Sequence, residues 1–222
     1  MSKLKNNEQR AKNAITLILI VMIVKAISIF SNYHQYRLLQ SVSHGNKISI
    51  EAATNNDLIQ RIISITYLIV FIISAITFIQ WFRRAYFNLN IKVDSLENSD
   101  GWAAGCWFVP VLSLFMPYLI MKELYDKTNS LLLKQFDTYI KRSTLFVGWW
   151  WTLWITVNIF GYVIVFSTKF GTESITSLIV TTFLSIIGAF VFIPLAIITI
   201  KVIKDYSLIE KMIYEISNDV ME

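Results

Sequence analysis

The feature that most constrains the fold of this chain is an uncharged apolar run from Ile62 to Phe82. A helix of this length, at about 1.5 Å per residue, is about 31 Å long, which matches the hydrocarbon thickness of a bilayer. Charged residues make up only 16% of the chain, whereas soluble domains carry about a quarter. We therefore expect an all-α polytopic membrane helix bundle, with 62–82 as one transmembrane helix.

Three other stretches are long enough to cross a bilayer. Residues 145–168 and 175–200 are uncharged, and residues 13–33 are interrupted only by Lys25. A cleaved signal peptide is the alternative for 13–33, because several cations precede it. Its apolar run is long for a signal core, and residues 28–31 offer no clear small-x-small cleavage site. We therefore favour four transmembrane helices in a single membrane domain, 1–222.

A fifth apolar block, residues 102–121, is uncharged but contains Gly105, Pro110 and Pro117. Each proline removes a backbone donor and clashes with the preceding helical turn, so a straight lipid-facing helix is disfavoured. We expect a Pro-broken re-entrant or interfacial segment between spans two and three. Its predicted parts are a short helix from Trp102, a break near 110–114 and a second helix that enters at Pro117. A fifth span is the alternative.

The distribution of cations favours four spans. If 102–121 does not cross, segments 1–12, 83–144 and 201–222 lie on one side with 15 Lys and Arg residues, against four on the other. If it does cross, the counts become 8 with the N-terminus and 11 opposite. Because cytoplasmic loops carry the Lys and Arg excess, the four-span arrangement predicts that the N- and C-termini are both cytoplasmic.

Tryptophan placement points to a cytoplasmic-side Trp/Arg interfacial layer. In the four-span arrangement all seven tryptophans fall at or near the cytoplasmic interface, where an indole ring is buried and its N–H stays hydrated. The net charge of +5 does not indicate nucleic acid, because the cations lie between apolar blocks. We expect membrane lipids as partners, together with a second copy of the chain or another membrane protein.

Three motifs follow one another in the middle of the chain. Residues 81–89 read W-x-x-R-A-Y-x-N-L, residues 102–110 read W-x-x-G-x-W-F-x-P, and residues 117–123 read P-Y-x-x-M-x-E. With this pattern the chain resembles a bacterial integral membrane family grouped as domain of unknown function 4328, over roughly residues 60–200. The resemblance implies a protein of the bacterial cytoplasmic (inner) membrane and brings no established activity. One departure is Ser113, where the family pattern has Asn.

The motifs supply the candidate functional residues. These are Trp81, Arg84, Tyr86, Asn88, Trp102, Gly105, Trp107, Pro110, Pro117, Tyr118 and Glu123. Arg84 and Asn88 are one helical turn apart, so we expect them to face residues 102–121 together. Lys25 is a further candidate because it is the only ionisable side chain within a predicted span. With no intramembrane acid to pair with it, we expect Lys25 to extend toward the headgroups.

The sequence gives little sign of an enzyme. We expect no catalytic residues, metal or cofactor, because His34 and His44 share one short loop without a ligand cluster and no nucleotide-binding or hydrolase motif is present. Residues 205–217 have the spacing of an amphipathic helix for the membrane surface or a partner. The leading hypothesis is a non-enzymatic scaffold or sensor. The alternative is a small oligomeric channel or transporter lined by 102–121, and a lipid-modifying enzyme is third.

Overall fold

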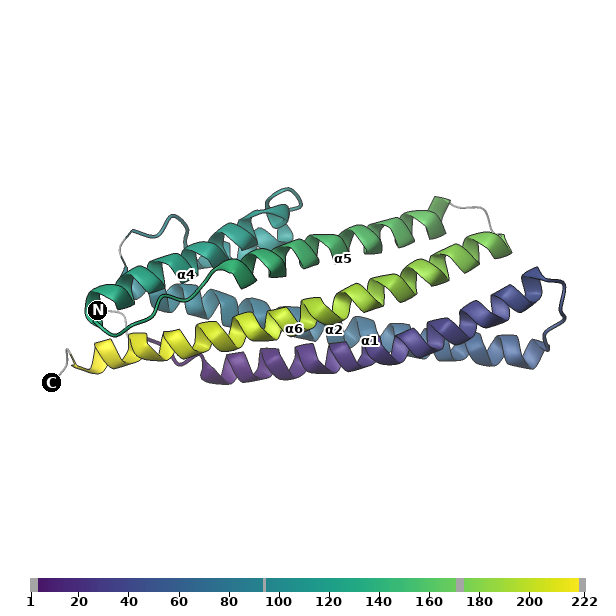
Figure 1. Ribbon diagram of the computed structural model, residues 1–222, viewed down its shortest axis with the longest axis horizontal. Coiled ribbons are helices and arrows are strands. Elements are labelled where there is room, and N and C mark those ends of the chain that lie inside the picture. The colour runs from purple at the N-terminus through teal and green to yellow at the C-terminus, as the bar shows by residue number, and fades with distance from the viewer. Residues whose placement is uncertain (1–3, 94, 171–173, 220–222) are drawn as a thin grey trace. The chain divides into compact units, whose positions relative to one another are not determined.

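The computed structural model describes residues 4–93, 95–170 and 174–219 (Figure 1), and these residues contain helices and no strand. The elements in chain order are α1 (Glu8–Ser43), α2 (Ile50–Lys92), α3 (Asp100–Gly105), the 3-10 turns η1 (Cys106–Phe108) and η2 (Leu112–Leu114), α4 (Met116–Gln135), α5 (Leu145–Phe170) and α6 (Ile175–Asp219). The all-α prediction is confirmed.

Four helices, α1, α2, α5 and α6, are long and apolar enough to cross a membrane. The four predicted spans, 13–33, 62–82, 145–168 and 175–200, each lie within one of them. Helix α6 has 45 residues, about 68 Å at about 1.5 Å per residue, so it is much longer than a hydrocarbon core of about 30 Å. Its first cations after the apolar run, Lys201 and Lys204, mark where α6 continues beyond the predicted span.

Residues 102–121 do not form one continuous helix. The six-residue α3 begins after Ser99, whose side chain accepts a hydrogen bond from the Trp102 amide, and two 3-10 turns follow. Pro110 lies between these turns. Pro117 occupies the first turn of α4, where its missing N–H needs no partner. The backbone of 102–121 therefore consists of a short helix, two 3-10 turns and the start of α4.

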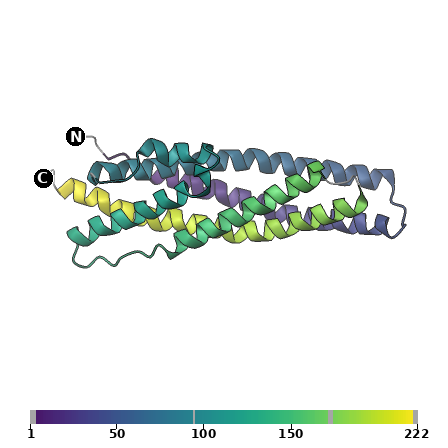
Figure 2. The same cartoon turned by 90° about the horizontal axis from the view of Figure 1, so that it is seen from above.

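The chain divides into two compact units, and each of the four long helices contributes to both. Unit 1 comprises residues 1–17, 73–151 and 198–222, and unit 2 comprises 18–72 and 152–197. Within unit 1, the start of α1 and the end of α6 lie at the same end (Figures 1 and 2). Residues 93–144, which join α2 to α5, begin and end in this same unit. Unit 1 therefore gathers both ends of the described chain and the whole α2–α5 connection.

Unit 2 contains the α1–α2 connection and the remaining parts of the four long helices. Gly45 allows the tight α1–α2 turn, because its φ of +85° is a conformation that side chains with a Cβ rarely adopt. Gln60 of α2 donates a 3.0 Å hydrogen bond to Ser31 of α1, and the Tyr36 ring contacts Phe183 of α6. Polar and aromatic side chains thus join the helix segments of this unit.

The predicted amphipathic helix 205–217 is a direct continuation of the last apolar run within α6. Its apolar side chains Tyr206, Ile209 and Ile213 are buried, whereas Leu208 is exposed. The apolar face therefore packs inside unit 1, and the amphipathic pattern reflects burial against the rest of this unit.

Candidate functional site

The core of unit 1 is a cluster of large aromatic rings. The Phe78 ring lies 5.6 Å from Trp81, 5.8 Å from Trp107 and 5.9 Å from Trp150, measured between centroids. Trp81 and Trp150 are buried. The Trp81 indole, which we expected near the headgroup layer, packs against protein within this cluster.

The second and third motifs are anchored on α5. The Tyr118 ring stacks on Trp151 at 6.4 Å, the Trp151 indole N–H donates to the Leu114 carbonyl oxygen at 3.2 Å, and Pro117 is buried. Trp102 and Pro110 are exposed. At Gly105 an added Cβ would lie 3.9 Å from the Trp102 ring, an ordinary contact, so packing does not require glycine there.

Tyr86 and Glu123 form the centre of a hydrogen-bond network between α2 and α4. The fully buried Tyr86 donates from its hydroxyl to Glu123 Oε2 at 2.6 Å. Glu123 also accepts from the Glu97 amide at 2.6 Å and from Asn98 Nδ2 at 3.4 Å, and the Asn98 amide donates to the Tyr86 hydroxyl at 3.2 Å. Burial and the Glu123 carboxylate raise the pKa of Tyr86, so the phenol keeps its proton. This network fixes the α2–α3 loop on α4.

A second network is centred on Asn88 and Glu210. Asn88 Nδ2 lies 2.8 Å from Glu210 Oε1, 2.8 Å from the Tyr214 hydroxyl and 2.9 Å from the Lys5 carbonyl oxygen. Asn88 Oδ1 accepts from the Lys5 amide at 3.0 Å. Asn88 was expected to face 102–121 and instead joins the N-terminal segment to α6, while Tyr86, two residues earlier, faces the α2–α3 loop. The two side chains point to different neighbours because they lie about 200° apart around α2.

Glu210 is a buried carboxyl group that accepts hydrogen bonds from two asparagine side chains. It is 3% exposed and accepts from Asn88 and from Asn7 Nδ2, the latter 3.0 Å from Oε2. Glu210 lies ten residues beyond the predicted span 175–200. Desolvation raises the pKa of Glu210 to about 7, against the opposing effect of these hydrogen bonds and of the Arg84 charge. Arg84 therefore acts on Glu210 through its charge.

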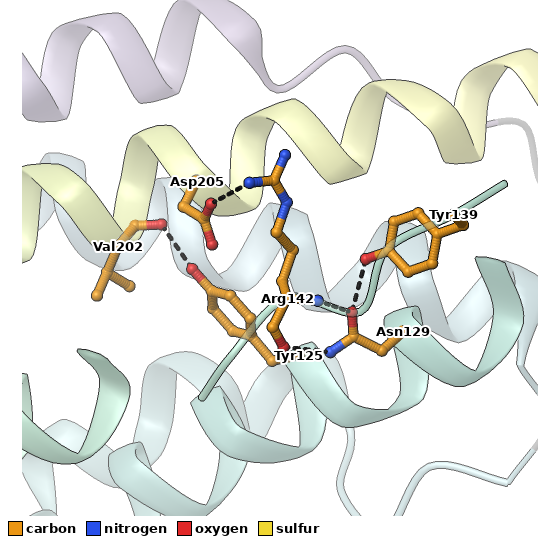
Figure 3. Close-up of polar contacts among 6 residues, drawn as sticks. All are labelled: Tyr125, Asn129, Tyr139, Arg142, Val202 and Asp205. Carbon is orange, nitrogen blue, oxygen red and sulfur yellow. Dashed lines mark hydrogen bonds and ion pairs between the residues drawn. The ribbon is translucent and has the colours of Figure 1, made fainter. Parts of the chain in front are cut away.

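A third network, missed by the sequence analysis, holds the α4–α5 loop (Figure 3). Asn129 Oδ1 accepts from the Tyr139 hydroxyl at 2.6 Å and from the Arg142 amide at 2.9 Å, and Asn129 Nδ2 donates to the Arg142 carbonyl oxygen at 3.0 Å. The Arg142 guanidinium pairs with Asp205 of α6 at 3.4 Å. Tyr125 adds a 3.0 Å hydrogen bond to the Val202 carbonyl oxygen. One buried asparagine thus fixes an otherwise irregular loop.

Several exposed apolar side chains lie on and beside the two 3-10 turns of unit 1. Phe108 is 76% exposed and Val111 is 68% exposed. The other exposed members of this group, which we call the apolar strip together with Phe108 and Val111, are Val109, Leu114, Phe115 and Leu119. The strip is the part of the fifth apolar block, 102–121, whose large apolar side chains are exposed.

Lys25 lies in unit 2, apart from these networks. Its ammonium group lies 3.8 Å from the centroid of the Tyr67 ring and 5.9 Å from that of Phe192. The side chain therefore contacts aromatic faces of two neighbouring helices, which provides a favourable environment for a cation away from water.

The sequence contains a signal for the burial of Glu210 that the amphipathic pattern of 205–217 did not by itself reveal. Residues 206, 209, 210 and 213 follow the i, i+3, i+4, i+7 spacing of one helical face, so an acid at 210 falls within the apolar stripe. The contribution of Asn7 and Asn129 depends on chain segments that meet only in the folded protein, and their spacing gives no local signal.

Comparison with known proteins agrees with the motif analysis. No curated protein and no solved structure matches the chain. Residues 44–207, which include all three motifs, match the model of the family described as Domain of unknown function (DUF4328). The chain therefore belongs to this family.

Proposed function

We propose that the chain is a non-enzymatic scaffold or sensor of the bacterial cytoplasmic membrane, with unit 1 at the cytoplasmic surface and residues 102–121 in the headgroup layer. Four apolar helices support a membrane protein. Unit 1 carries 15 of the 20 Lys and Arg residues, the excess that cytoplasmic segments of membrane proteins carry. The same cations suit anionic lipid headgroups as partners.

The observation that carries this proposal is the exposure of the apolar strip. Contiguous exposed apolar surface marks sites that meet a membrane or another protein. The strip lies on short 3-10 turns around Pro110, and lipid-exposed irregular backbone does not occur within the hydrocarbon region. A position at the membrane interface accounts for both the exposed apolar side chains and the irregular backbone. The side chains can enter lipid there while the backbone stays at headgroup level.

The strip is held firmly enough to act as an anchor. Trp151 donates a hydrogen bond to the Leu114 carbonyl oxygen and stacks on Tyr118, so contacts with α5 hold the segment in place. Trp102 is partly exposed at its start, and an indole ring favours the headgroup level. A rigid interfacial element of this kind can transmit a change in the lipid layer to α4 and α5.

A channel lined by 102–121 is the competing function, and the geometry favours it less. A permeation path needs polar groups along its wall, whereas the strip presents apolar side chains. The Ser113 hydroxyl, a polar group within this segment, donates to the Pro110 carbonyl oxygen at 2.8 Å and is thereby engaged locally.

The position of the strip can be tested with nitroxide labels in liposomes. Single cysteines at Phe108 and Val111, in a Cys106→Ala background, are expected to collide more often with oxygen than with a water-soluble nickel complex. A label at Ile140, which is 83% exposed in the α4–α5 loop of the same unit, is the matched control and should show the reverse. Equal nickel access at all three sites would refute the interfacial position.

A flux assay on the same liposomes separates the two functions. We expect no ion or solute flux above that of empty liposomes across several ions and membrane potentials. Flux that changes when Arg84 or Asn88 is replaced would overturn the scaffold or sensor proposal in favour of the channel.

A further inference from the structure

The N-terminal segment of unit 1 is attached in an unusual way. Residues 4–7 precede α1 and are not helical, and we call them the N-terminal arm. The arm is held by the side chains of three residues, Asn88 on α2 and Glu210 and Tyr214 on α6, together with one carbonyl oxygen. Lys5 bonds to Asn88 through its amide and its carbonyl oxygen, and Tyr214 donates to that carbonyl oxygen at 2.6 Å.

Asn7 is the residue of the arm that covers Glu210. Its Nδ2 group lies 3.0 Å from Glu210 Oε2 and 3.3 Å from the Trp81 carbonyl oxygen. Asn7 is 2% exposed, and its Oδ1 atom is buried without a hydrogen-bond partner among the described residues. The docked arm therefore leaves one polar atom unsatisfied and removes a carboxyl group from water, and both costs disappear if the arm detaches and water enters.

We propose that Glu210 is a proton-operated latch, which holds the N-terminal arm on α2 and α6 when protonated and releases it when it loses the proton to water. The protonated group is neutral and tolerates burial under Asn7. The carboxylate gains hydration when the arm leaves, so charge favours the open state. This inference does not depend on the proposed position of the apolar strip.

Glu210 is the group of this cluster that changes charge near neutral pH. From the arm side, Glu8 pairs with Lys12 and Lys211, and its hydrogen bond with Lys12 lowers the pKa of Glu8. From α2, the charge of Arg84 lowers the pKa of Glu210 and so opposes the effect of burial. From α6, burial raises the pKa of Tyr206 and of Tyr214, so both stay neutral. Both histidines of the chain belong to unit 2.

The expected size of the effect follows from the linkage between opening and proton release. Burial raises the pKa of Glu210 from 4.5 to about 7 in the docked state, and the open state regains the ordinary value. The equilibrium constant for arm opening should therefore rise on the order of 70-fold between pH 5 and pH 8. The rise is gradual because it spans the interval between the two pKa values.

Hydrogen exchange of the full chain in lipid nanodiscs tests the latch. Protection factors, corrected for the intrinsic pH dependence of exchange, are followed for a peptide covering residues 4–12 and for a reference peptide within α4. We expect protection of 4–12 to fall on the order of 70-fold from pH 5 to pH 8, while the α4 peptide changes little. Protection of 4–12 that is independent of pH in the unmodified chain would by itself overturn the proposal.

Two variants identify the responsible carboxyl group. Glu210→Gln, which keeps a neutral side chain of the same shape, should show the same protection of 4–12 at both pH values. Glu215→Gln removes an exposed acid of the same helix and should retain the pH dependence of the unmodified chain. A pH dependence that persists in Glu210→Gln would contradict the latch.

Discussion

The hydrogen-bond network between α2 and α4 can be tested most sharply at the bond between Tyr86 and Glu123. The variants are Tyr86→Phe, Glu123→Gln and the double variant. The Tyr86 hydroxyl is 2.6 Å from Glu123 Oε2 on a fully buried ring. A hydrogen bond to a charged group contributes about 1.5–3 kcal/mol. Tyr86→Phe should therefore lower the free energy of unfolding by about 2 kcal/mol, because Glu123 keeps its bonds from Glu97 and Asn98 and is not left unpaired.

The double-mutant cycle isolates the pair itself. We expect a coupling energy of about 1.5 kcal/mol between Tyr86 and Glu123, less than the single loss because the Asn98 amide also loses an acceptor in Tyr86→Phe. The assay is reversible unfolding in mixed micelles, followed by tryptophan fluorescence. Tyr162→Phe, at an exposed tyrosine of unit 2, is the matched control and should change stability by less than about 0.5 kcal/mol. A coupling energy below about 0.5 kcal/mol would refute the network.

Three further predictions follow from unit 1. Asn129→Ala removes the three hydrogen bonds that hold the α4–α5 loop, so limited trypsin digestion should cut within 136–144 faster, as measured by mass spectrometry. Glu210 has a raised pKa of about 7, so unfolding free energy should fall by about 3 kcal/mol as pH rises from 4.5 to 7, and denaturant titrations of Glu210→Gln should lack this loss. Ile213→Ala should cost about 3 kcal/mol in the same titrations, because Ile213 is 1% exposed, whereas Leu208→Ala, at a residue 56% exposed, should cost under about 1 kcal/mol.

The long helices were predictable because length and absence of charge act locally. A run such as 62–82 must satisfy its backbone within itself in lipid, so the apolar segment alone indicates a helix. Pro117 was likewise predictable as a helix start, since a proline in the first turn lacks only an N–H that has no helical partner. These inferences needed no knowledge of neighbouring segments.

The contacts of individual side chains were predictable only in part. A motif tyrosine and glutamate could be named from the family pattern, but their pairing depends on how α2 meets α4. Trp81 is ambiguous in sequence, because an indole ring suits both a headgroup layer and an aromatic core. Asn7 and Glu210 are 203 positions apart along the chain, and their contact follows from the packing of unit 1.

In the proposed arrangement the chain crosses the membrane four times, and the α2–α5 connection lies on the same side as the termini. Labelling with a membrane-impermeant thiol reagent tests it most directly, with single cysteines at Asn6, Asn46 and Ile140 in a Cys106→Ala background. We expect Asn6 and Ile140 to react in inverted vesicles, and Asn46, in the α1–α2 turn, to react in right-side-out cells. Reaction of Ile140 from the same side as Asn46 would refute the four-span arrangement.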